Sequence, residues 1–106
     1  MALIRAMSGS SGGGGVVLNP TVISHGAGNN LGNMEFTIDT SKKYMVVSGC
    51  MVSSDERCRI DYVEDGQDTI LQAGINPNSS VTISGTTLTV NLGRGLYNFY
   101  SLIQLD

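Results

Sequence analysis

The chain has 106 residues, the length of a single domain, and charged residues make up only 14% of it. The formal net charge is −3 and the six basic residues do not cluster, which argues against a nucleic-acid-binding protein. No stretch approaches the ~20 apolar residues of a membrane span, and the N-terminus lacks the apolar core of a secretory signal, so we expect synthesis in a cytoplasm and no membrane insertion.

Residues 1–15 are expected to form a flexible arm. An apolar tip, Met1-Ala2-Leu3-Ile4, precedes the Gly/Ser run of residues 8–15, and Gly-rich segments of this kind behave as random coil. An engineered linker is the alternative interpretation of the run. A phosphate-binding loop is excluded because no Gly-Lys-Ser/Thr and no helix follow it. We therefore predict an arm over residues 1–15 and a β-sandwich domain over residues 16–106.

Short segments rich in Val, Ile, Thr and Tyr, separated by Gly, Asn, Asp and Ser, fill the rest of the chain. The predicted strands are Val16–Asn19, Thr21–Ser24, Asn33–Asp39, Tyr44–Val52, Arg57–Val63, Asp68–Ala73, Ser80–Ser84, Thr87–Leu92 and Tyr97–Leu105. This spacing is typical of a sandwich or barrel, and no window shows helical periodicity. The sequence therefore predicts an all-β, antiparallel β-sandwich or jelly-roll-like fold.

The dipeptide Asp65-Gly66 predicts a type I′ hairpin. A two-residue loop there gives the pairs Val63–Asp68, Tyr62–Thr69 and Ile60–Leu71. Residues of one character then share each face: Cys58, Ile60, Tyr62, Leu71 and Ala73 lie on one, and Arg57, Arg59 and Asp61 on the other. This separation supports the predicted register.

Two later turns are predicted in the same way. Gly85-Thr86 pairs Ile83 with Leu88 and Val81 with Val90. Arg94-Gly95 pairs Leu92 with Tyr97 and Val90 with Phe99. The sequence thus predicts two successive hairpins near the end of the chain.

Two predicted strands are apolar on both faces. In Tyr44–Val52, the residues Val46, Cys50 and Val52 alternate with Met45, Val47 and Met51. In Tyr97–Leu105, the residues Tyr97, Phe99, Ile103 and Leu105 alternate with Tyr100 and Leu102. One face of an antiparallel sheet normally meets water, so a second apolar face requires a second sheet, the N-terminal segment or another subunit. We take this as a sign of self-association.

The candidates for catalytic or metal-binding residues are the single His and the acidic side chains. His25 is the single histidine, and without a base partner or companion ligands it is predicted to be an ordinary loop residue. The acidic residues lack the alternating pattern of a calcium loop and are predicted to be solvated turn carboxylates. They are Asp55, Glu56, Asp61, Glu64, Asp65 and Asp68. We predict no catalytic, cofactor or metal site.

Cys50 and Cys58 flank a predicted turn. An odd-membered loop would place them opposite each other, as in a cross-strand disulfide, and an even loop would place Cys58 opposite Met51 instead. Two reduced, buried cysteines are the favoured interpretation for a cytoplasmically made protein.

The aromatic residues Tyr97, Phe99 and Tyr100 lie close together in the last predicted strand. They would form a sugar-stacking patch if exposed, but aromatic side chains more often belong to a core or an interface, which is the reading we favour.

The chain resembles small structural proteins of tailed bacteriophages and prophages in four features taken together. These are the start Met-Ala-Leu-Ile, the Gly/Ser arm, the hairpin over residues 81–90 and the closing strand over residues 97–103. The resemblance is one of general organisation along the chain and not of a diagnostic motif, so it assigns no functional residues. It implies a non-enzymatic tail, fibre-associated or capsid-decorating subunit. It also implies a homotrimer located in the virion, with residues 1–15 docked on other virion proteins.

Two alternatives from other functional classes are kept. A carbohydrate-binding module for bacterial surface glycans would require exposed aromatic side chains such as Tyr97 and Tyr100, and it could coexist with a place in the virion. A small enzyme would require His25 in a cleft beside a carboxylate with a shifted pKa. No cofactor is expected in any of these readings.

Overall fold

The computed structural model describes residues 18–50, 58–74, 79–93 and 97–106, and the predicted arm lies outside them. These residues form two antiparallel sheets packed as a sandwich, which confirms the predicted fold class. The strands are β1 (Thr21–Asn29), β2 (Asn33–Thr37), β3 (Tyr44–Cys50), β4 (Cys58–Glu64), β5 (Gln67–Ala73), β6 (Ser79–Ser84), β7 (Thr87–Leu92) and β8 (Tyr97–Gln104). No helix that could cross a membrane occurs in these residues.

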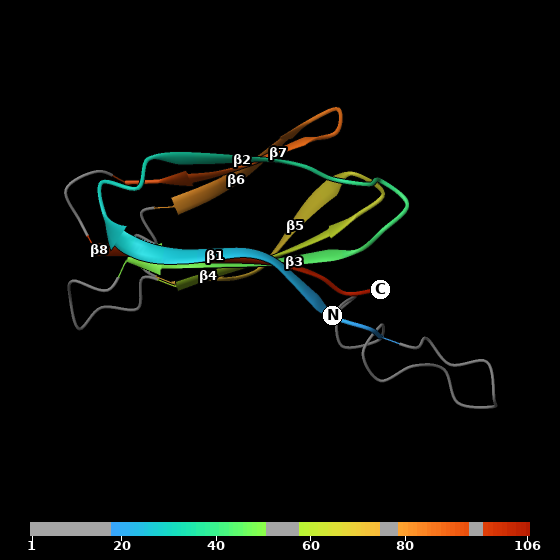
Figure 1. Cartoon of the computed structure of the whole chain (residues 1–106), viewed down its shortest axis with the longest axis horizontal. Helices are drawn as coiled ribbons and strands as arrows, with labels where there is room; N and C mark the ends of the chain where they lie inside the picture. Colours follow the sequence, from blue (N-terminus) through green and yellow to red (C-terminus); the bar gives the residue numbers. More distant parts are fainter. Residues whose placement is uncertain (1–17, 51–57, 75–78, 94–96) are drawn as a thin grey trace.

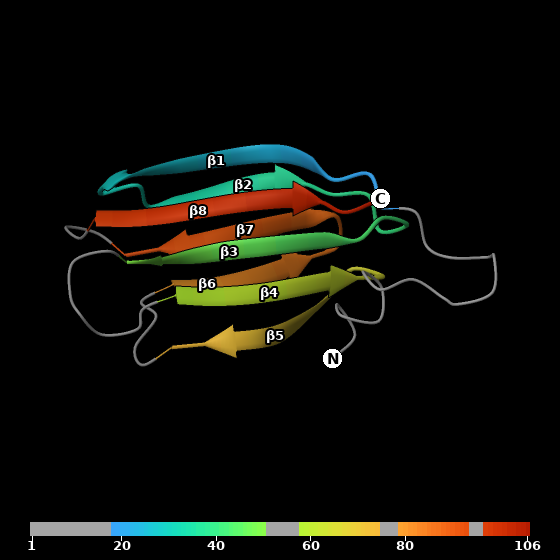
Figure 2. The ribbon, with the colours of Figure 1, turned by 90° about the horizontal axis from the view of Figure 1, so that it is seen from below.

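Five strands form the larger sheet, in the order β1-β8-β3-β4-β5, and three form the smaller one, in the order β2-β7-β6 (Figures 1 and 2). The pairing is nested as in a jelly roll, since β1 pairs with β8, β2 with β7 and β4 with β5. The β3 and β6 strands are not neighbours in one sheet but face each other across the sandwich. Instead, β3 pairs with β4 in the larger sheet and β6 pairs with β7 in the smaller one.

The Asp65-Gly66 turn has the predicted hairpin geometry, with both residues at positive φ, 54° and 70°. The pairs Val63–Asp68 and Tyr62–Thr69 are confirmed. The predicted pair Ile60–Leu71 is wrong, because a bulge between Ile60 and Asp61 shifts the register and places Ile60 opposite Gln72. Beyond the bulge Ala73 lies opposite Arg59, so Ala73 does not share the face of Ile60. Arg57 lies outside the described residues.

The two later turns have different outcomes. The hairpin at Gly85-Thr86 is confirmed, with Ile83 opposite Leu88 and Val81 opposite Val90. The predicted hairpin at Arg94-Gly95 is wrong, because β7 belongs to the smaller sheet and β8 to the larger one. A strand that is apolar on both faces is better buried inside the larger sheet, where β8 lies between β1 and β3, than at the end of a hairpin.

The first described strand is longer than predicted, since β1 continues through His25-Gly26-Ala27-Gly28 to Asn29. The Gly-rich composition that suggested a loop reflects close packing on β8. A Cβ at Gly26 would lie 3.0 Å from the Tyr100 ring, so only glycine fits there without displacing the ring. The predicted strand Val16–Asn19 is not found in its described part, where Asn19 only donates a hydrogen bond to the Leu105 carbonyl.

The main core lies between the two sheets. Its buried residues include Val46 on β3, Val63 on β4, Leu88 and Val90 on β7, and Leu102 on β8. This layer holds the two sheets together through burial of branched aliphatic side chains.

A second apolar cluster lies on the outer face of the larger sheet, the face turned away from the smaller sheet. Tyr62 and Leu105 are buried at its centre. Leu18, Met45, Leu71 and Ile103 pack against them. The apolar face predicted for β4 and β5 is therefore the outer one at Tyr62 and Leu71, while Arg59 and Asp61 share the inner face with Val63.

The outer face of the smaller sheet differs sharply in character. Ser80, Thr82 and Asn91 lie on it, and the Asn91 amide donates to both hydroxyl groups, at 3.1 and 3.3 Å. Thr89 and Glu35 lie opposite each other on the same face. One outer side of the sandwich is thus polar and the other apolar, as expected if only one of them meets water.

Candidate functional site: a buried carboxyl pair

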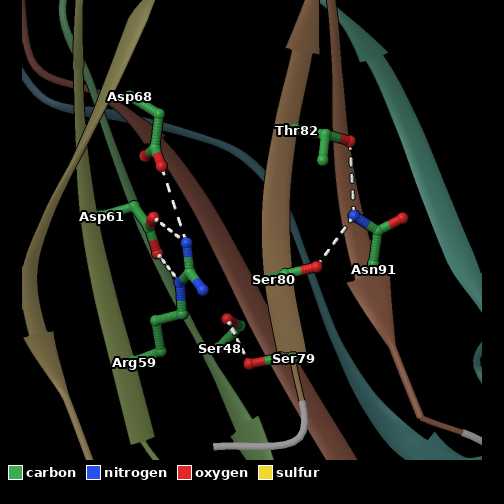
Figure 3. A network of polar contacts seen from close by, with 8 residues as sticks. All are labelled: Ser48, Arg59, Asp61, Asp68, Ser79, Ser80, Thr82 and Asn91. Carbon is green, nitrogen blue, oxygen red and sulfur yellow. Dashed lines mark hydrogen bonds and ion pairs between the residues drawn. The ribbon is translucent and has the colours of Figure 1, made fainter.

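The most unusual polar cluster lies on the inner face of the larger sheet, where β4 and β5 pair (Figure 3). Arg59 and Asp61 are two residues apart on β4, so strand alternation places both on the face that holds Val63. Asp68 on β5 lies opposite Val63 and points toward the same pair. Hairpin geometry thus brings two carboxyl groups and one guanidinium together.

The Arg59 guanidinium binds Asp61 through two parallel hydrogen bonds. Its Nε donates to Oδ1 at 2.7 Å and its Nη2 donates to Oδ2 at 2.8 Å. The same Nη2 lies 3.6 Å from Oδ2 of Asp68. The Asp61 side chain has no exposed surface, whereas 19% of the Asp68 side chain is exposed. The guanidinium therefore neutralises one buried carboxylate fully and the second only in part.

Burial raises the pKa of Asp68 to about 7, and a hydrogen bond with Asp61 and repulsion from it add to the effect. The nearby Arg59 charge opposes this rise. The Arg59 pKa is raised as well, mainly by its hydrogen bonds to Asp61. The Asp68 Oδ1 atom is buried and has no hydrogen-bond partner among the described residues. The raised pKa of Asp68 therefore favours its protonated form at acidic pH, up to about pH 7.

A hydroxyl pair lies next to the cluster and connects the two sheets. Ser48 on β3 is fully buried, and its Oγ lies 3.0 Å from Oγ of Ser79 on β6 (Figure 3). The hydrogen bond satisfies both hydroxyl groups at a place where the apolar core ends.

The prediction of solvated turn carboxylates is therefore wrong for two of the six acidic residues. Asp61 and Asp68 are largely buried within strands, whereas Glu64 and Asp65 are exposed. The other two, Asp55 and Glu56, lie outside the described residues. The signal that could have found the cluster was in the predicted register, which grouped Arg59 with Asp61 on one face. What the sequence did not show was that this face points inward.

His25 lies on β1, at the opposite edge of the larger sheet from β5, and is exposed. It is in a strand rather than the predicted loop, and it does not meet the carboxyl pair. Within the described residues, no group of three or more His, Cys, Asp or Glu side chains could hold a metal ion.

The two cysteines are free, and Cys58 lies opposite Gly49. Cys50 therefore points to the inner face and Cys58 to the outer one, as the alternation of strands requires. This register excludes the cross-strand disulfide. The alternative pairing of Cys58 with Met51 is also wrong, because Cys58 lies opposite Gly49. Cys50 is buried, but Cys58 is only half-buried.

The aromatic residues of β8 are divided between its faces. Tyr100 is buried, and its hydroxyl lies 2.7 Å from Oγ of Ser24. Tyr97 is 43% exposed at the start of the strand. The two tyrosines therefore cannot form one exposed sugar-stacking platform.

Asp68 can bind and release a proton near neutral pH, but the Asp61 side chain beside it has no exposed surface with which to touch a substrate. We expect the effect of Asp68 in the pH dependence of stability. The pKa of Asp68 is higher in the folded state than in the unfolded chain, so the folded state binds more protons between the two values. The free energy of unfolding that this group contributes is therefore full below about pH 4 and falls as the pH rises toward about 7.

The variant Asp68→Asn tests this expectation, because a neutral amide retains a donor and an acceptor without titrating. Urea unfolding midpoints of both proteins should be measured from pH 4.5 to pH 8. The midpoint of the wild type should decline relative to the variant across this range. Parallel curves would show that Asp68 titrates as an ordinary carboxyl.

Comparison with protein-family models, curated proteins and solved structures found no match to this chain.

Proposed function

We propose that the protein is a non-enzymatic structural subunit of a tailed-phage or prophage particle. In this role the sandwich associates with copies of itself, and residues 1–15 attach it to other virion proteins. The observation that carries the proposal is the exposed apolar surface of the larger sheet. Val22, Ile23, Ile70 and Tyr97 are 43% to 56% exposed there, whereas the outer face of the smaller sheet carries Ser, Thr and Asn.

The described residues that bear on chemistry support this choice. The carboxyl pair is shielded between the sheets, and His25 lies at the far edge. The glycan-binding alternative requires both tyrosines to be exposed, and Tyr100 is buried in the core. The resemblance favours three copies, and it is the single basis for that number.

The attachment is tested by deleting residues 1–15. The truncated sandwich should keep its unfolding midpoint but should no longer be incorporated into particles, because its own core lies within residues 18–106. Incorporation is measured by the protein content of purified particles, with the full chain as control. Normal incorporation of the truncated chain would contradict anchoring through this segment.

A further inference from the structure

The β1 strand is an open edge of the larger sheet, and it is the longest strand of the fold. Among the described residues it pairs with β8 alone (Figure 2). A bulge interrupts its register between Val22 and Ser24. From Ser24 to Asn29 the register is continuous, so alternate residues of this stretch direct their backbone donors and acceptors away from β8 at regular intervals.

Proteins usually protect such edges with charged side chains, proline or bulges. The β2 edge carries the exposed Glu35, and the β5 edge carries Asp68 and a bulged pairing with β4. The β6 edge is shorter and contacts β5 across the side of the sandwich. Residues 24–29 of β1, by contrast, contain no Asp, Glu, Lys or Arg, no proline and no bulge, and their one titratable residue, His25, is counted as neutral at pH 7.

Exposed apolar side chains lie at both ends of this edge. Among the described residues, four large hydrophobic side chains are exposed, and three of them lie on β1 or opposite it. Val22 is 56% and Ile23 is 45% exposed on β1 itself, and Tyr97 lies opposite Asn29. Backbone pairing along β1 would therefore bring apolar surface to the same contact.

We propose that β1 pairs antiparallel with β1 of a second copy of this chain, joining two five-stranded sheets across a two-fold axis. An antiparallel edge strand is complementary to itself, because residue i faces residue j and j faces i. A protein of net charge −3 repels its copies through any acidic edge, whereas the neutral β1 edge meets no such repulsion.

The inference rests on the self-association in the proposed function and changes its expected geometry. A two-fold contact makes a dimer, or an assembly with an even number of copies, instead of the trimer favoured by the resemblance.

The test is sedimentation of the full chain at micromolar concentrations, combined with hydrogen exchange of the β1 amides. The variant Ala27→Lys places a charge at an exposed position of the regular stretch, close to its symmetry mate. Its dimer dissociation constant should rise about 10- to 100-fold, because like charges that meet across an interface are strongly unfavourable. The amides of residues 24–29 should exchange slowly in the wild type and rapidly in the variant.

The matched control is Thr69→Lys, at an exposed position on the opposite edge strand of the same sheet, which should leave the dimer intact. An odd-numbered assembly, or a dimer that tolerates Ala27→Lys, would overturn the edge pairing while leaving self-association in place. A wild-type monomer would overturn both. Protection of β1 that disappears when residues 1–15 are deleted from a monomer would identify the chain's own arm as the occupant.

Discussion

Replacing Arg59 with Met should lower the free energy of unfolding by about 3–5 kcal/mol, a large part of the 5–15 kcal/mol that stabilises a typical domain. The side chain of Asp61 has no exposed surface, and its two oxygens both accept hydrogen bonds from the guanidinium. Met keeps the apolar stem but leaves a buried carboxylate without its counter-charge. Urea denaturation of the single variant and of the wild type at pH 8 measures the loss.

The double variant Arg59→Met/Asp61→Leu separates the charge effect from packing. It should regain most of the lost stability, because a buried ion pair is often replaced by apolar residues at little cost. Glu35→Gln, which removes an exposed charge on β2, should change the free energy of unfolding by less than about 0.5 kcal/mol. A loss of less than about 1 kcal/mol for Arg59→Met would mean that Asp61 is solvated and that the pair is not closed to water.

Replacing Tyr62 with Ala should cost about 3–5 kcal/mol, as much as a substitution in the main core, although Tyr62 lies on the outer face of a sheet. Only 2% of its surface is exposed, because the cluster around Leu105 covers it. Removing the ring opens a cavity between Met45, Leu71 and Ile103. The change in the unfolding midpoint of the full chain measures this cost.

Thr69 supplies the control, since it lies directly opposite Tyr62 on β5 and is exposed. Thr69→Ala should change stability by less than about 0.5 kcal/mol. Equal effects at the two positions would show that the outer cluster is a surface patch and not a second core.

The sequence predicted those parts of the fold that depend on short-range chemistry. The turns at Asp65-Gly66 and Gly85-Thr86 set their hairpins because their glycines adopt positive φ, at 70° and 60°. The alternation along β4 correctly separated Arg59 and Asp61 from Tyr62. These features need only neighbouring residues, so a sequence contains enough information to predict them.

Features that depend on distant residues were missed. The neighbours of β8 in the sheet are β1 and β3, which lie far away along the chain, and the Arg94-Gly95 signal does not indicate this pairing. Whether the charged face of β4 points inward depends on which sheet covers it, and alternation alone does not determine that. The pKa of Asp68 depends on the same placement. The strand character of His25–Gly28 depends on the Tyr100 ring against Gly26.

The central place of β8 also has a consequence for how the protein folds. Of the eight strands it is made last, yet it separates β1 from β3, and the first strand has no other described partner. The larger sheet thus cannot close until the final strand has been synthesised. Its contacts between β1 and β8 join residues far apart in the sequence, so forming them carries a large entropic cost of loop closure. Until then the backbone edges of β1 and β3 that pair with β8 remain unpaired, which makes the interval before closure the time when aggregation or early association with other copies competes with folding.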